Sequence, residues 1–145
     1  MLYRHGLRGS EVINLKVSDV DLLHSRIWMS RMKYGIPVEN PISGDELRAI
    51  KRCLLSRKYN LQWLFVNQRL LPLTRLAMNY IFNRATEKAK LSIVHPHTLR
   101  HSCRFYLANK GYDLRLIQDY LGHRDAKHTA HYTRVVSKRL EKMWL

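Results

Sequence analysis

The sequence lacks the features that mark membrane, secreted and cysteine-based zinc proteins. It contains no run of about 18 apolar residues, the length that a helix needs to cross a bilayer. The first residues, MLYRHGLRGSE, turn polar at once, so no signal peptide is expected. Cys53 and Cys103 lie far apart and form no CxxC pair, which argues against a zinc knuckle and favours a reducing compartment. We expect a cytoplasmic protein with no membrane partner.

Acidic residues are also scarce. The chain holds 26 lysines and arginines against 11 aspartates and glutamates, so its formal net charge is +15. Such an excess favours a partner made of phosphates, because a polyanion releases counterions when basic side chains neutralise it. An anionic membrane surface is the main alternative. No single amphipathic basic helix stands out, however, and this favours nucleic acid.

The length of 145 residues suits one domain, and the chain shows no internal repeat, low-complexity tract or long linker. The patterns predict helices at 10–20, 43–58, 74–90, 95–111, 113–122 and in the last twenty residues, with strands at 26–33 and 38–42 and an extended run at 62–67. This order predicts a mainly α fold with a small antiparallel β-hairpin, in the α+β class.

Capping residues support these boundaries. Ser43 and Glu46, three apart, form the pattern of a capping box. Thr74 and Asp113 are suitable N-cap residues, and Gly122 is suited to end a helix.

The stretch HPHTLRHS places His97 and Arg100 three residues apart, so that they share a helix face, which Arg104 extends. We expect this face to point outward. An arginine offers a planar fork to two phosphate oxygens, and a histidine exchanges a proton near neutral pH. The alternative is an ordinary solvated basic face.

The stretch LGHRDAKHTAHYTR surrounds Tyr132 with cations. Cations favour the phenolate and bind a phosphate, so Tyr132 is a candidate nucleophile. A half-buried structural tyrosine is the alternative. The histidines at 123, 128 and 131 also allow a zinc site and zinc-dependent hydrolysis, but Arg124 and Lys127 would repel a metal cation.

Two further basic residues stand in unusual places. Arg8 lies between Gly6 and Gly9, which allow close backbone approach, and Glu11 is placed to orient it. Lys33 lies in the predicted hairpin, where it could reach into a bound groove. Each could equally be an ordinary solvated side chain.

The order of these elements is more specific than any one of them. An arginine in G-x-R-x-S-E, a lysine in a hairpin, H-x-x-R, and L-G-H followed nine residues later by tyrosine resemble the catalytic domain of the tyrosine recombinase, or phage integrase, family. The stretches HPHTLRHSC, RLIQDYLGHR and HTAHYT are similar to the short recombinases that invert fimbrial promoters.

The resemblance implies roles for the matching residues. Tyr132 would attack a DNA phosphodiester and form a 3′-phosphotyrosyl link. Arg8 and Arg100 would bind the non-bridging oxygens, and Glu11 would support them. The remaining catalytic residues would be Lys33 as the acid for the leaving 5′-oxygen, His97 in proton transfer and His123 as a donor to the phosphate, with Arg104, Arg124 and Lys127 binding DNA.

The resemblance also implies partners. These are double-stranded DNA with inverted-repeat sites and a homo-tetramer on that DNA, in the bacterial cytoplasm at the nucleoid, without cofactor, metal or small-molecule substrate. The apolar C-terminal segment would pack on a neighbouring protomer or on its own core. A type IB topoisomerase is an alternative, but the histidine at position 97 favours a recombinase.

Family members carry helices before the first arginine motif, and many add a core-binding domain that clamps DNA. Here Met1 stands seven residues before Arg8. We therefore expect residues 1–145 to be an N-terminally truncated catalytic domain with apolar surface exposed around residues 1–15. A catalytically idle DNA-binding remnant that modulates a full-length recombinase is the alternative function.

Overall fold

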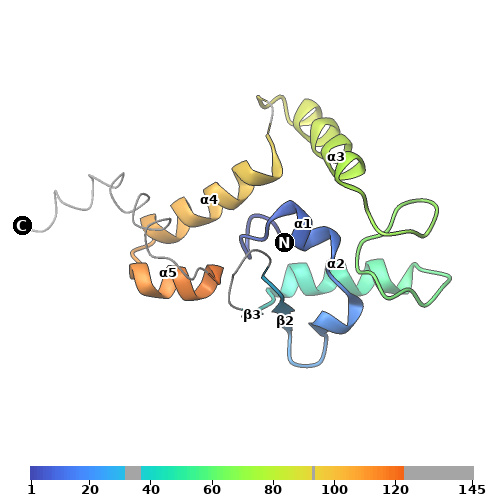
Figure 1. Cartoon of the computed structure of the whole chain (residues 1–145), viewed down its shortest axis with the longest axis horizontal. Helices are drawn as coiled ribbons and strands as arrows, with labels where there is room; N and C mark the ends of the chain where they lie inside the picture. The colour runs from blue at the N-terminus through green and yellow to red at the C-terminus, as the bar shows by residue number, and fades with distance from the viewer. Residues whose placement is uncertain (32–36, 93, 123–145) are drawn as a thin grey trace, which may run out of the picture.

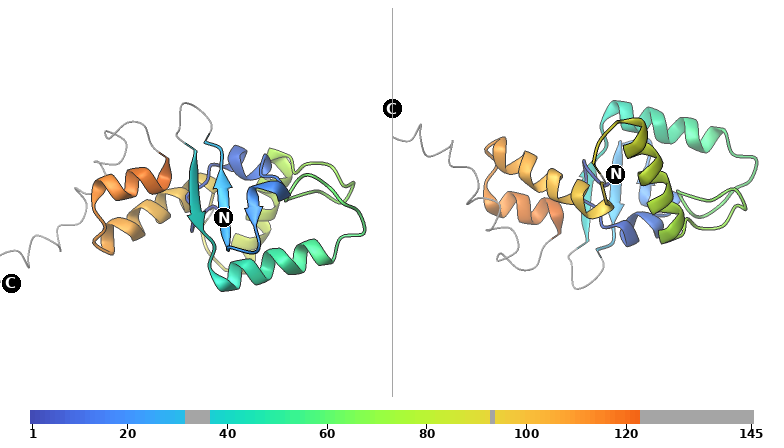
Figure 2. Two further views of the ribbon diagram at one scale, coloured as in Figure 1. Left: turned by 90° about the horizontal axis from the view of Figure 1, so that it is seen from below. Right: turned by 90° about the horizontal axis from the view of Figure 1, so that it is seen from above.

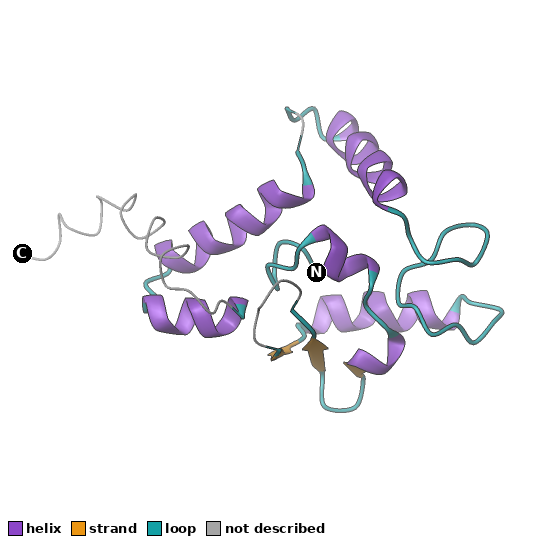
Figure 3. Ribbon diagram, viewed as in Figure 1, coloured by secondary structure: helices purple, strands orange, loops and turns teal. Residues whose placement is uncertain are grey.

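The computed structural model of the chain describes residues 1–31, 37–92 and 94–122. Five α-helices and three strands fill this part of the chain (Figures 1 and 3). They are α1 (Gly9–Ile13), a 3-10 turn (Val17–Asp19), β1 (Val20–Asp21), β2 (Arg26–Met29), β3 (Val38–Pro41), α2 (Gly44–Leu55), α3 (Arg75–Lys88), α4 (Pro96–Asn109) and α5 (Leu114–Leu121). The predicted class, mainly helical with a small antiparallel sheet, is confirmed.

The sheet is antiparallel with the order β1-β2-β3, and β2 lies at its centre. Ile27 of β2 pairs with Asn40 of β3 and with Val20 of β1. The short strand β1 was not predicted, because two residues are too few to show alternation. Figure 2 shows α2 along one side of the sheet, while α4 and α5 lie side by side beyond β3. The end of α5 contacts β3, so the helical pair is joined to the sheet.

Two apolar clusters hold the described part together. The larger cluster packs the sheet against α1 and α2, with Ile27, Met29, Leu64 and Leu7 each almost fully buried. The smaller cluster joins α4 to α5 and contains Cys103, Ala108, Ile117 and Leu121. Burial of apolar side chains of this kind is the main favourable term in folding.

The expected exposure of apolar surface around residues 1–15 is wrong for most of this stretch, although Tyr3 is 42% exposed. Leu2, Leu7, Val12 and Leu15 are all less than a tenth exposed. They belong to the larger cluster because the N-terminal segment lies across the sheet and α2.

The predicted helix at 10–20 is also shorter than expected. Its N-cap is Arg8, and it runs only from Gly9 to Ile13. The chain then extends, because the carbonyl of Leu15 accepts a hydrogen bond from the N–H of Leu64, and the N–H of Val17 donates to the carbonyl of Gln62. This pairing with a distant segment takes the place of further helical turns, and it could not be read from the local pattern.

Close approach of the backbone occurs at the two glycines that flank Arg8. Gly6 has φ +57°, and a Cβ there would clash with a methyl carbon of Leu121. A Cβ at Gly9 would lie 2.6 Å from the Met78 methyl carbon of α3. The predicted close approach of the backbone at both glycines is therefore confirmed. The positive φ favours glycine at Gly6, whereas at Gly9 the flexible end of Met78 is the group that would have to move.

The helix starts and ends follow the predicted chemistry in three of four cases. The Thr74 side chain accepts from the N–H of Ala77 at 3.1 Å, and Asp113 accepts from Arg115 at 3.0 Å. Gly122 ends α5 in the left-handed region, with φ +63°. The capping box at Ser43 does not form, since the carboxylate of Glu46 is taken by other partners.

Those partners are the N-terminal ammonium of Met1, at 2.9 Å, and Nε2 of His5, also at 2.9 Å. Burial by itself raises the pKa of Glu46. The hydrogen bond from His5 and the charge of the ammonium outweigh it, so the pKa falls from 4.5 to about 2. His5 is buried, so this pair fixes the N-terminal segment on α2.

A Glu46→Gln variant is expected to lose up to about 3 kcal/mol of unfolding free energy at pH 7. Each unit by which the folded-state pKa of Glu46 lies below its ordinary pKa corresponds to about 1.4 kcal/mol. The folded-state pKa is the lower one, so this stabilisation is present above about pH 4.5 and is lost as the pH falls toward 2. Urea unfolding of both proteins from pH 7 to pH 2.5 measures it. A variant that keeps the wild-type pH profile would contradict the expectation.

Candidate active site

Arg8 and Glu11 are held together at the start of α1. The carboxylate of Glu11 accepts the backbone N–H of Arg8 at 2.7 Å and Nη1 of the Arg8 guanidinium at 2.8 Å. The Glu11 side chain is 1% exposed, whereas that of Arg8 is 26% exposed. One buried carboxylate thus fixes a guanidinium that reaches toward solvent.

Arg100 joins this pair from α4. Its Nη1 donates to the carbonyl of Gly6 and lies 3.6 Å from Oε2 of Glu11. Its side chain is 2% exposed, so the expectation that His97 and Arg100 both point outward is wrong for Arg100. Helical spacing alone does not say which side of a helix faces the protein. His97 is exposed, as expected.

A third guanidinium, which the sequence reasoning missed, completes the cluster. Nη1 of Arg31 donates to Oε2 of Glu11 at 3.2 Å. The signal available in the sequence was the two-residue spacing of Ile27, Met29 and Arg31, which places all three on one face of an extended chain. We call Arg8, Glu11, Arg31 and Arg100 the arginine cluster.

Charge in the arginine cluster is unbalanced, with three guanidinium groups against the carboxylate of Glu11. Burial alone raises the pKa of Glu11, but the N–H of Arg8 and the charge of Arg31 outweigh it and hold the pKa below its ordinary value. Burial, then the nearby charges of Arg104 and Arg8, lowers the pKa of Arg100 to about 9, so that it is still a cation at neutral pH. A partly dry, electropositive cluster of this kind suits an anion with several oxygens.

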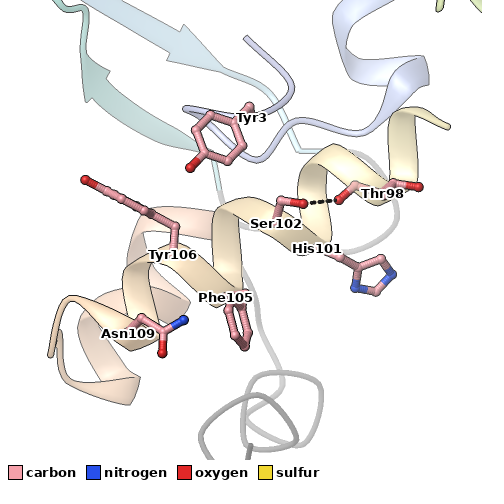
Figure 4. Close-up of a pocket in the computed structure, with 7 residues that line it drawn as sticks. All are labelled: Tyr3, Thr98, His101, Ser102, Phe105, Tyr106 and Asn109. Carbon is pink, nitrogen blue, oxygen red and sulfur yellow. Dashed lines mark hydrogen bonds between the residues drawn. The ribbon is translucent and has the colours of Figure 1, made fainter. Parts of the chain in front are cut away.

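The outer side of α4 carries a different surface. Figure 4 shows Tyr3 and Tyr106 facing each other, with ring centroids 6.1 Å apart, while His101 points away from them. These three residues line a shallow pocket together with Phe105 and Asn109. Arg100 lies on the inward side of the same helix, so this pocket is separate from the arginine cluster.

Of the predicted DNA-binding residues, Arg104 lies in the described part and is half-buried on α4. It lies one turn beyond Arg100, and its charge contributes to the lowered pKa of Arg100. Five other predicted site residues lie outside the described residues: Lys33, His123, Arg124, Lys127 and Tyr132. The zinc alternative at 123, 128 and 131 also lies outside them.

The described residues contain no group of three or more histidine, cysteine, aspartate or glutamate side chains placed to hold a metal ion. Their helices include none long and apolar enough to cross a membrane.

The sequence model of the phage integrase family matches residues 1–139. The chain belongs to the phage integrase family. The predicted resemblance is therefore confirmed, and the arginine motif and the H-x-x-R helix are parts of one family domain. The match also includes the segments that hold Lys33, His123 and Tyr132.

Known family members agree in sequence and in structure. The type 1 fimbriae regulatory protein FimB of Escherichia coli strain K12 is 40% identical over 149 residues, which cover 99% of this chain and 74% of FimB. The crystal structure of XerA recombinase superposes with a TM-score of 0.83 at 30% identity and covers 99% of this chain. XerH site-specific recombinase, bound to a palindromic difH substrate after cleavage, gives 0.80 at 27% identity. The chain spans 54% of the XerA chain and 43% of the XerH chain.

Proposed function

We propose that the chain is the catalytic domain of a site-specific DNA recombinase, which cuts and rejoins DNA through a 3′-phosphotyrosyl intermediate. The observation that carries this proposal is the convergence of Arg8 and Arg100 on Glu11. The two arginines come from the separate G-x-R-x-S-E and H-x-x-R motifs of the family. Family membership and the likeness to XerA and XerH support the same activity.

In this proposal, Tyr132 supplies the nucleophile. Its phenolate oxygen attacks the phosphorus, the bond to the 5′-oxygen breaks, and that oxygen takes a proton from Lys33. Arg8 and Arg100 bind the two non-bridging oxygens, whose negative charge grows in the transition state. Each well-placed donor of this type contributes about 3 kcal/mol to lowering the barrier.

Two histidines have supporting roles in the proposal. His97, exposed at the first turn of α4, assists proton transfer, and His123 donates a hydrogen bond to the phosphate. The phosphotyrosine keeps the energy of the cut bond, so the hydroxyl of another strand reseals it by the reverse reaction. The proposed reaction therefore needs neither ATP nor a metal ion.

Binding of DNA in this proposal rests on charge. The formal net charge of +15 suits a long phosphate backbone, and Arg104, Arg124 and Lys127 would contact phosphates around the cut site. Contacts of this kind position the protein on the duplex without reading its sequence. The affinity should therefore fall steeply as the salt concentration rises.

The proposed substrate is a promoter element flanked by inverted repeats, of the kind that switches fimbrial genes, and the outcome is inversion. The similarity to a fimbriae regulatory protein supports this choice. Four protomers would act together on two sites, in the bacterial cytoplasm on nucleoid DNA. Joining two sites requires four strand cuts, and each protomer supplies one nucleophile.

Covalent trapping tests the proposal. The protein is mixed with nicked suicide DNA that carries candidate inverted repeats from its own genome, and a denaturing gel shows any DNA-linked protein. Wild type is expected to form an adduct, and Tyr132→Phe is expected to form none because it lacks the attacking oxygen. Salt-sensitive DNA binding without an adduct would favour the idle remnant, provided that a longer form of the protein cleaves the same DNA. Site-independent relaxation of a supercoiled plasmid would instead indicate a topoisomerase.

A further inference from the structure

Arg31 is a cation on the inward side of the sheet. Burial alternates along 26–31, with Ile27 and Met29 inward and Trp28 outward, and this alternation carries Arg31 to the core side. Its side chain is 0% exposed. Burying a guanidinium is costly unless acceptors compensate it, so its partners show what it does.

The guanidinium of Arg31 joins three segments of the chain. Nη1 donates to the carboxylate of Glu11, on α1, at 3.2 Å. Nη2 donates to the carbonyl of His5 at 3.1 Å and to the carbonyl of Tyr120 at 3.2 Å. A planar fork reaches three acceptors in this way, whereas the ammonium of a lysine on a shorter stem does not.

The hydrogen bond to the carbonyl of Tyr120 caps the C-terminal end of α5. Carbonyls in the last turn of a helix lack partners within the helix and carry the negative end of its dipole. Arg31 satisfies the carbonyl of Tyr120 with a positive charge, and Asn40 approaches the same oxygen at 3.5 Å. Figure 1 shows the end of α5 beside β3. Gly122 is the C-cap residue of this helix.

The other two contacts reach the groups that support the phosphate-binding arginines. The His5 carbonyl belongs to the same short backbone stretch as the Gly6 carbonyl, which accepts from Arg100. Glu11, in turn, holds Arg8. Arg31 therefore contacts Glu11, which holds Arg8, and the backbone stretch whose Gly6 carbonyl holds Arg100. The hydrogen bonds that its own guanidinium makes go to protein groups.

We propose that Arg31 is a positioning residue, which fixes Glu11 and the backbone of residues 5–6 so that Arg8 and Arg100 present a rigid clamp for one phosphate. This role rests on the proposed function, because the clamped phosphate is the DNA phosphate that Tyr132 attacks. Arg31 itself does not touch the phosphate. A clamp that is misplaced by about 1 Å loses about 100-fold in rate, whereas overall DNA affinity depends mostly on other phosphates.

The test compares Arg31→Lys with wild type, with Arg26→Lys as the matched control. Arg26 begins β2, the strand that leads to Arg31, and it is exposed. Arg31→Lys is expected to form the covalent adduct about 30-fold more slowly while binding the DNA within about 2-fold of wild type. Arg26→Lys is expected to match wild type in adduct formation.

A second measurement separates positioning from simple stability, and it does not need cleavage. The melting temperature of each protein is measured in sodium phosphate and in sodium chloride of equal ionic strength. A general loss of stability lowers both values equally and leaves the increment due to inorganic phosphate unchanged. Loss of the clamp reduces that increment, so we expect it in wild type and Arg26→Lys and expect most of it to be absent in Arg31→Lys.

Each outcome decides one of the two proposals. If wild type forms no adduct on DNA that a longer form of the protein cleaves, but has a phosphate increment that Arg31→Lys lacks, the recombinase proposal fails for this chain. The role of Arg31 in holding Arg8 and Arg100 for a phosphate then stands. A normal adduct rate or a normal increment in Arg31→Lys overturns the positioning role and leaves the recombinase untouched. Arg31→Gln, which keeps a planar donor, is measured in parallel. If neither variant melts cooperatively, Arg31 is needed for folding itself, and that result also overturns the positioning role.

Discussion

Arg100→Lys is expected to lower the rate of covalent adduct formation about 100-fold. Lysine keeps the charge but not the fork with which Arg100 bonds the carbonyl of Gly6 and would hold a phosphate oxygen at the same time. The lost donor acts on charge that builds up in the transition state, so the rate falls far more than the affinity for DNA. Single-turnover trapping on suicide DNA measures the rate, and fluorescence anisotropy measures the affinity.

The matched control is Arg115→Lys. Arg115 lies on α5, 81% exposed, and its ion pair with Asp119 at 3.6 Å is a surface contact. Such a pair contributes little, so this variant should cleave and bind as wild type does. If the Arg100→Lys protein cleaves at the wild-type rate, Arg100 is not part of the active site. Equal losses of rate and affinity would show that it serves DNA binding in general.

Glu11→Gln is expected to lower the unfolding free energy by about 4 kcal/mol at neutral pH. The change leaves the guanidinium groups of Arg8, Arg31 and Arg100 without the carboxylate that they share, and removing one partner of a buried ion pair is strongly destabilising. Urea unfolding measures the difference. Glu87→Gln, an exposed position on α3, is the control and should change stability by less than about 0.5 kcal/mol.

The stability difference between Glu11→Gln and wild type is expected to depend on pH. The folded-state pKa of Glu11 is lower than its ordinary pKa. The stabilisation by the carboxylate is therefore present above the ordinary pKa and is lost as the pH falls through the folded-state pKa. The two proteins should therefore become more alike in stability under acid conditions. A constant gap between them from pH 7 to pH 3 would show that the carboxylate acts through shape and not through charge.

Local chemistry in the sequence predicted several elements correctly. Thr74 and Asp113 cap their helices, and Gly122 ends α5 in the left-handed region. These features depend on a few neighbouring residues, which is why they can be read locally. The order of the motifs around Arg8 and Arg100 predicted the family, since that order is a property of the sequence alone.

Contacts between distant segments decided what the local patterns missed. Glu46 suits a capping box with Ser43, but His5 and the N-terminal ammonium lie close enough in the fold to take its carboxylate. The first helix stops at Ile13 because the next residues pair with the segment around Leu64. In both cases a partner far away in the sequence outcompetes the local one.

The arginine cluster shows the same division. The motifs are enough to single out Arg8, Glu11 and Arg100 as site residues. Folding of the whole chain is what turns Arg100 inward and brings Arg31 to the same carboxylate. The physical reason is that a charged side chain becomes buried only where carbonyls and a counter-charge from several segments meet, and that meeting is a property of the folded chain.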